Sequence, residues 1–146
     1  MKKISIIGLI LIIILLQGCG SEPAYPFSQP FENIERIEII EVSSYAFTPR
    51  NQLCNLDAIV TVERDQWSDF ISDFKKIPCG RFFFDPSGTI IGYTIRITYS
   101  DGGYEYICEY SGLHMKADGD WDNLYYYFDR ELFDSFIKKA INEFSQ

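Results

Sequence analysis

The sequence predicts an α+β domain, an antiparallel sheet of about five strands with two amphipathic helices packed on one face. Short segments rich in β-branched and aromatic residues, separated by Gly, Asp and Ser, are typical of such a sheet. Two longer segments repeat their apolar residues at helical spacing. The segments follow the order strand, strand, helix, several strands, helix, which is typical of a sheet whose helices share one face.

Length and charge indicate one folded, acidic domain. We divide the 146 residues into a leader at 1–18, a linker at 19–31 and a single domain at 32–146, large enough for one hydrophobic core. The leader holds two of the 13 basic residues and no acidic one, which leaves 11 basic and 21 acidic side chains and a net charge of −10. That charge excludes nucleic acid as a partner. An aromatic content of 16% is too high for a disordered acidic segment.

Two strands are predicted at the start of the domain. Residues 34–42 form the first, and their alternation of apolar and polar side chains breaks at Ile39 and Ile40, which predicts a bulge or burial on both faces. Residues 43–55 are expected to form a loop. The second strand, at residues 57–63, has three apolar side chains on one face: Ala58, Val60 and Val62.

A helix is predicted to follow the second strand. Asp65 is expected to cap its beginning, and Pro78 with Gly80 to end it. The apolar residues recur at intervals of three and four, so that one face of the helix packs on the core. These residues are Trp67, Phe70, Ile71, Phe74 and Ile77.

Asp101 and Gly102 predict the tight turn of a β-hairpin, of type I′. The register of that turn puts apolar and aromatic side chains opposite one another on one face. The pairs are Tyr99 with Tyr104, Ile97 with Tyr106, and Ile95 with Cys108. On the other face, Arg96 lies diagonal to Glu105 and Glu109.

The end of the chain predicts short strands and a second helix. Residues 113–117 and 125–128 are expected to add strands, and Asp129 to cap the helix after them. The helix has one continuous apolar stripe. Its members are Leu132, Phe133, Phe136, Ile137, Ala140, Ile141 and Phe144.

The N-terminus has the pattern of an export signal. Lys2 and Lys3 precede an apolar run of 13 residues, from Ile4 to Leu16. A membrane-spanning helix needs about 20 apolar residues, whereas the core of a signal peptide needs only about 7–15. The length of the run therefore favours a cleaved signal peptide over a spanning helix.

The residues that follow, Leu16, Gln17, Gly18 and Cys19, resemble the lipobox of bacterial lipoprotein precursors. This resemblance covers about the first 20 residues, and the domain resembles small bacterial lipoproteins in general layout only. It implies recognition of residues 16–18 by signal peptidase II, cleavage before Cys19, and diacylglycerol and fatty acid on that cysteine. The domain would then be lipid-anchored to the cell membrane and face outside the cytoplasm. An ordinary secretory signal and an uncleaved anchor helix are the alternatives.

The linker at 19–31 is rich in proline, with Pro23, Pro26 and Pro30. Such a composition predicts an extended tether outside the fold, which would span roughly 35 Å at about 3.1 Å per residue.

Three cysteines remain in the domain, an odd number. The second strand runs away from Cys54 and the following helix returns, which predicts a Cys54–Cys79 disulfide contributing about 3 kcal/mol. Export from the cytoplasm permits such a bond. Cys108 is expected to be a buried thiol. The alternative is three buried thiols, because spacing does not determine connectivity.

Four aspartates resemble the ligand positions of an EF-hand calcium loop. Counted from Asp118, these carboxylates occupy positions 1, 3, 5 and 12: Asp118, Asp120, Asp122 and Asp129. Asn123 stands where the loop needs Gly, and the twelfth residue is Asp in place of the longer Glu. The alternative interpretation is a solvated hairpin loop followed by a helix cap.

Catalytic chemistry has little support in the sequence, and we assign no catalytic residue. His114 is the only histidine, and Ser111 nearby has no nucleophile motif around it. Eight of the ten tyrosines fall between Tyr93 and Tyr127, where they either pack in the core or form a recognition surface.

The sequence therefore predicts a non-enzymatic, lipid-anchored domain that binds a partner at the cell envelope, with a protein as one candidate partner. It needs no cofactor beyond the lipid on Cys19. A calcium-dependent form of the module, through the loop from Asp118 to Asp129, and an envelope hydrolase are the alternatives.

Overall fold

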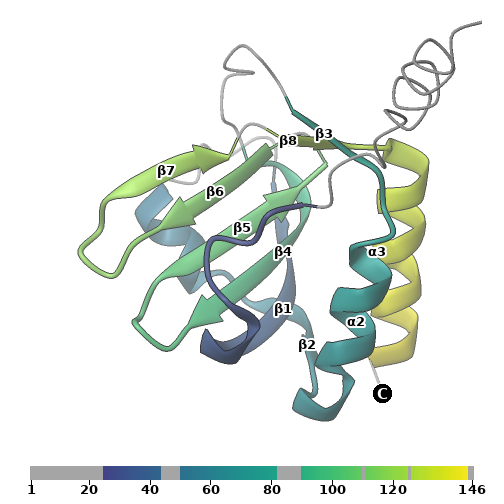
Figure 1. Ribbon diagram of the computed structural model, residues 1–146, viewed down its shortest axis with the longest axis horizontal. Coiled ribbons are helices and arrows are strands. Elements are labelled where there is room, and N and C mark those ends of the chain that lie inside the picture. Colours follow the sequence, from purple (N-terminus) through teal and green to yellow (C-terminus); the bar gives the residue numbers. More distant parts are fainter. Residues whose placement is uncertain (1–24, 44–49, 82–89, 110, 125, 145–146) are drawn as a thin grey trace, which may run out of the picture.

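The centre of the molecule is a six-stranded antiparallel sheet with the strand order β2-β1-β4-β5-β6-β7 (Figure 1). The computed structural model describes residues 25–43, 50–81, 90–109, 111–124 and 126–144. The strands are β1 (Ile34–Val42), β2 (Ala58–Val62), β4 (Gly92–Tyr99), β5 (Tyr104–Cys108), β6 (Ser111–Met115) and β7 (Trp121–Leu124). A two-stranded sheet joins β3 (Cys79–Arg81) to β8 (Tyr126–Phe128).

Two helices cover one face of the sheet, as predicted (Figure 1). They are α2 (Trp67–Phe74) and α3 (Arg130–Phe144). The α+β class is confirmed, and the main sheet has one strand more than the expected five or so. Among the described residues, no helix is long and apolar enough to cross a bilayer.

Strand β1 is buried on both faces. Ile37 and Ile39 pack against the helices, whereas Ile40 and Val42 belong to a second cluster on the opposite face. The pairing of β1 with β2 shifts between Ile39 and Ile40, which confirms the irregularity predicted there. A short 3-10 helix at Arg50–Asn55 (η2) supplies Leu53 to the second cluster.

A buried ion pair ties η2 to this second face. The Arg96 Nε lies 2.8 Å from Glu38 Oε2, and both side chains are almost fully buried. The same guanidinium donates through Nη1 to the carbonyl oxygens of Leu53, Cys54 and Leu56 at 2.8–3.2 Å. The predicted position of Arg96 near Glu105 and Glu109 is therefore wrong.

The hairpin register differs from the prediction by one residue. Its turn spans three residues, because the Tyr99 N–H donates to Gly103 O and the Gly102 N–H donates to Tyr99 O, each at 2.9 Å. Gly102 has φ +84°, the left-handed conformation that such three-residue turns place at their last position. Ile97 consequently pairs with Glu105, not with Tyr106.

This one-residue difference in register moves each side chain of β5 to the opposite face of the sheet. Glu105 now faces the helices, and Tyr106 and Cys108 join the second cluster with Ile40. The sequence S-D-G-G allows both turns. The Asp101 side chain favours the longer one by accepting the Gly103 N–H at 2.8 Å.

The helix caps are confirmed at one helix only. Asp129 caps α3 by accepting the Leu132 N–H at 3.0 Å. Asp65 does not cap α2, because it lies in a 3-10 turn at Arg64–Gln66 and makes no cap hydrogen bond. The Trp67 indole instead fixes the helix start by donating to Val62 O at 2.8 Å.

The Glu38–Arg96 pair leads to a prediction about stability. We expect Arg96→Leu to lower the free energy of unfolding by about 3–5 kcal/mol, because Glu38 would remain buried without its partner. Arg36 is the matched control, since it lies 3.7 Å from the same carboxylate but is 61% exposed. Arg36→Leu should cost less than about 1 kcal/mol. Urea unfolding measures both, and equal losses would contradict the prediction.

Candidate functional site

The most unusual side chain of the domain is Glu105, whose carboxylate is fully buried on the helix side of β5. Oε1 accepts a hydrogen bond from the Tyr25 hydroxyl at 2.6 Å. Oε2 accepts from the Ser28 N–H at 3.0 Å and the Ser28 hydroxyl at 2.8 Å. The Tyr99 hydroxyl donates to the same oxygen. Four donors thus reach this carboxylate, three at Oε2 and one at Oε1.

All four donors are neutral groups, which determines the electrostatics of this centre. Burial raises the pKa of Tyr25 and of Tyr99 above the usual value, and the adjacent Glu105 charge raises both further. Both hydroxyls therefore stay protonated and donate. A fully buried carboxylate that accepts four hydrogen bonds from its own chain is suited to holding structure together.

The donors show that the N-terminal segment, defined here as residues 25–31, belongs to the fold. Tyr25 is buried, and its ring packs against Phe74 and Phe128 at centroid distances of 5.9 and 5.6 Å. Gln29 Nε2 adds a hydrogen bond to Asp101 at 2.8 Å. The prediction that residues 19–31 are a tether outside the fold is therefore wrong for its second half, and the domain begins by Tyr25.

The sequence did not predict that residues 25–31 pack against the domain, for two reasons. The prolines dominated the composition, although Tyr25 and Phe27 are unusual in a solvated spacer. The wrong hairpin register also turned Glu105 away from the helix side, so that no buried acceptor was expected there.

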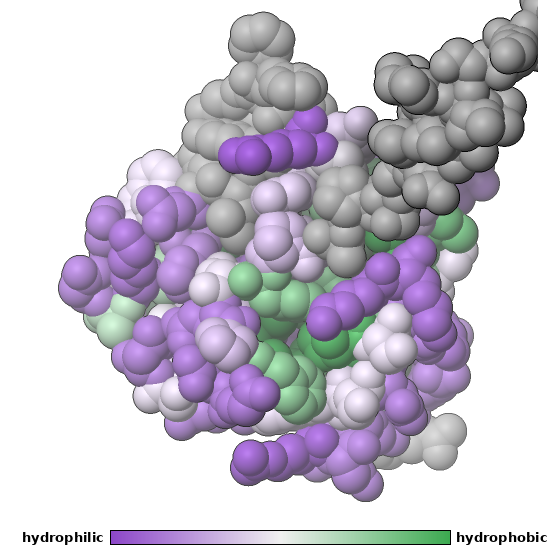
Figure 2. Space-filling model, in the orientation of Figure 1, coloured by the Kyte–Doolittle hydropathy of each residue, from purple (hydrophilic) through white to green (hydrophobic). Residues whose placement is uncertain are grey.

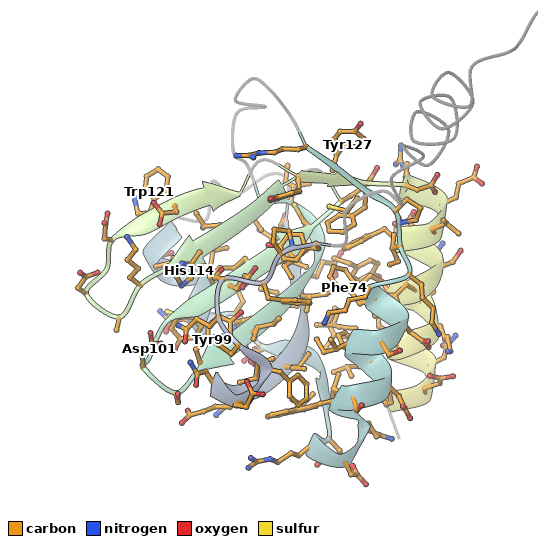
Figure 3. The ribbon with its side chains drawn as sticks, in the orientation of Figure 1. Phe74, Tyr99, Asp101, His114, Trp121 and Tyr127 are labelled. Atoms are coloured by element: carbon orange, nitrogen blue, oxygen red, sulfur yellow. The ribbon has the colours of Figure 1, made fainter. Side chains whose placement is uncertain are left out.

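His114 lies beside this centre. It pairs with Glu105 across β5 and β6, and its ring meets Tyr99 edge-on at 6.3 Å. Figure 3 shows Tyr99, Asp101 and His114 grouped near the hairpin turn. In the described part of the chain, the buried Nε2 of His114 has no hydrogen-bond partner.

The four aspartates of the predicted calcium loop occupy separate structures. The Asp118 carboxylate accepts the Asp120 N–H within the β6–β7 turn, while Asp129 caps α3. Lys116 Nζ lies 3.4 Å from Asp120 and 3.3 Å from Asp122. Strands β7 and β8 fill the middle of the expected loop, so the EF-hand arrangement is not formed. Across the described residues, no group of three or more metal-binding side chains gathers.

The predicted Cys54–Cys79 disulfide is wrong, and the described residues contain no disulfide. Helix α2 returns on one face of the sheet, which brings Cys79 into the helix-side cluster, whereas Cys54 follows Leu53 on the other face. The Cys54 thiol donates to Asn55 Oδ1 at 3.7 Å and the Cys79 thiol to Gly80 O at 3.8 Å. Cys108 is buried, as predicted. The lipobox residues Leu16, Gln17, Gly18 and Cys19 lie outside the described residues.

The tyrosines divide between core and surface. Tyr99 and Tyr106 are fully buried, which confirms the core interpretation for these two. The side chain of Tyr93 is 40% exposed and that of Tyr127 is 43% exposed. Trp121 is similarly exposed, and Figure 3 shows it and Tyr127 projecting outward from β7 and β8.

Two surface grooves flank α2. One, of about 540 Å³, lies between α2 and α3 over Phe70, Phe136 and Phe144. Its rim is charged. Asp73 Oδ1 lies 2.6 Å from Lys76 Nζ, and Asp73 Oδ2 lies 2.9 Å from Lys139 Nζ. The hydrogen bond from Lys76 is the main cause that lowers the pKa of Asp73. The other groove, of about 390 Å³, lies between α2 and residues 25–31.

Comparisons of the chain with protein-family models, with curated proteins and with solved structures found no match. The basis for a functional proposal is therefore the chemistry of its own residues: the predicted lipobox, the bound N-terminal segment and the two grooves.

The hydrogen bond between Tyr25 and Glu105 predicts that the two residues are coupled in their effect on stability. We expect Tyr25→Phe to lower the free energy of unfolding by about 1.5–3 kcal/mol, as for a lost hydrogen bond to a charged group. Tyr93→Phe, at an exposed site, should change it by less than about 0.5 kcal/mol. A double-mutant cycle of Tyr25→Phe with Glu105→Gln should give a coupling free energy above about 0.5 kcal/mol. Additive effects would refute the interaction.

Alkaline pH provides a second test. Burial raises the pKa of Tyr25, Tyr99 and Tyr106 in the folded state, while the unfolded chain titrates near pH 10. The folded state thus keeps protons that the unfolded chain loses above about pH 10. Stability from each tyrosine is complete below that pH and should fall by about 1.4 kcal/mol per pH unit above it.

Urea unfolding between pH 9 and 12 measures that slope. Tyr99→Phe should make the slope shallower by the contribution of one tyrosine. An unchanged slope in Tyr99→Phe would show that this hydroxyl titrates normally in the folded protein.

Proposed function

We propose that this chain is a bacterial lipoprotein, anchored through Cys19 to the cell membrane, whose domain acts outside the cytoplasm as an interaction module. The observation that carries the proposal is the order of a basic start, an apolar run of 13 residues, and Leu16–Cys19. The run is long enough for a signal peptide and too short to span a bilayer. Two or more acyl chains on the cysteine give stable membrane binding, where a single chain is marginal.

The N-terminal segment makes this anchor short. Because Tyr25 is bound to Glu105, only residues 19–24 remain to connect the lipid to the domain. Six residues span at most about 20 Å, well below the 35 Å or so of the tether expected from composition. The domain would therefore stay at the membrane surface and meet partners there.

An interaction role fits the chemistry better than catalysis does. Among the described residues of the helix side, the fully buried carboxylate is that of Glu105, and it accepts four hydrogen bonds from its own chain. The surface instead offers two grooves and exposed aromatic side chains such as Trp121 and Tyr127. Large aromatic side chains with a polar atom are typical of binding surfaces.

Substitution of Cys19 tests the anchor. In bacteria grown with a labelled fatty acid, we expect Cys19→Ser to abolish labelling and to leave precursor that still begins at Met1, because no other residue can accept the diacylglyceryl group. Cys108→Ser is the control, since this thiol is buried in the domain and should leave labelling intact. Gel fluorography and intact mass measure both. Labelled, processed Cys19→Ser protein would disprove the proposal.

A further inference from the structure

The groove between residues 25–31 and α2 has the chemistry of a surface that lies on a bilayer. Its volume is about 390 Å³, and most of its lining is apolar: Tyr25, Pro26, Phe27, Pro30, Phe31, Ile34 and Ile71. Figure 2 shows an apolar area, in green, near the centre of this face, with hydrophilic residues beside it. Phe31 is 45% exposed at one end of it.

The charge of the groove differs from that of the chain. Among the described residues that line it, Lys75 is charged and none is a carboxylate, although the chain carries a net charge of −8. Lys75 Nζ lies 5.7 Å from the centre of the Phe27 ring. A lysine beside apolar rings is the arrangement that buries an aliphatic stem at a membrane interface and keeps its ammonium near lipid phosphates. The groove between α2 and α3 lacks this pattern, because Asp69, Asp73 and Glu143 line it.

The closeness of the groove to Cys19 in the chain indicates which partner it meets. Tyr25, where the described chain begins, lines the groove itself, and Cys19 is six residues before it. The lipid would thus enter the membrane within about 20 Å of the groove, so that the nearest large apolar surface is the bilayer.

We propose that this groove rests on the phospholipids of the anchoring membrane, with Phe27 and Phe31 at the boundary between head groups and acyl chains and with Lys75 against a lipid phosphate. The inference depends on the lipid anchor of the proposed function. It adds a second contact and gives the domain a defined orientation, with α2 toward the membrane and the second cluster of the sheet away from it.

Fluorescence quenching by brominated lipids tests this orientation. The full lipidated protein is reconstituted into vesicles of phosphatidylethanolamine and phosphatidylglycerol that carry bromine on acyl carbons near the head groups. The fluorescence added by Phe31→Trp should be quenched by about half or more, since apolar side chains at an interface reach roughly 5–10 Å into it. Ile59→Trp is the matched control: Ile59 is 41% exposed on β2, on the face opposite Val60 and Val62. Its added fluorescence should not be quenched.

A charge variant in the Phe31→Trp background tests the contribution of Lys75. Lys75→Glu should weaken quenching of the Phe31→Trp signal at least about twofold by repelling lipid phosphates, whereas Lys138→Glu, exposed on α3, should leave it unchanged. Intact mass reports lipid on Cys19 separately. If the protein carries lipid but quenching is equal at positions 31 and 59, or absent at position 31, the groove does not contact the membrane and the lipid anchor still holds. If the protein carries no lipid, the proposed function itself is refuted.

Discussion

The buried carboxylate of Glu105 is the constraint on which the organisation of the domain depends. A carboxylate that is removed from water must receive hydrogen bonds, or its burial costs several kcal/mol. Two of its donor residues, Tyr25 and Ser28, come from the N-terminal segment, about 80 residues away in sequence. That segment is consequently held against the sheet, although its prolines and serine would otherwise favour an extended chain in water.

The two faces of the sheet are stabilised by different polar groups. Glu105 lies on the helix side with neutral donors, whereas Arg96 and Glu38 form an ion pair on the opposite side and hold η2 through its carbonyl groups. Each polar group attaches a segment that lacks long regular structure. The sheet therefore has apolar clusters on both faces, which bury most side chains of its central strands β1, β4 and β5.

Because both faces of the sheet are largely buried, the grooves and exposed aromatic side chains such as Trp121 and Tyr127 lie at the edges of the sheet and of the helix layer. The grooves lie on either side of α2, and the exposed Trp121 and Tyr127 lie on β7 and β8. The attachment of Tyr25 places one groove at the end of the chain that leads to Cys19. In the proposed lipid-anchored form, a short connection would restrict the rotation of the domain more than a long tether, so the hydrogen bonds that complete the core would also support the proposed orientation at the membrane.

The sequence by itself determined the class of fold, the first strand with its irregularity at Ile39 and Ile40, the two amphipathic helices and the Asp129 cap, because these depend on local periodicity and local hydrogen bonds. It also contains Leu16, Gln17, Gly18 and Cys19, on which the proposed lipid anchor depends. Only the tertiary structure decided the hairpin register, the partner of Arg96, the separation of Cys54 from Cys79 and the place of Tyr25. These depend on which face of the sheet a residue occupies, and one additional residue in a turn reverses that face for the whole strand.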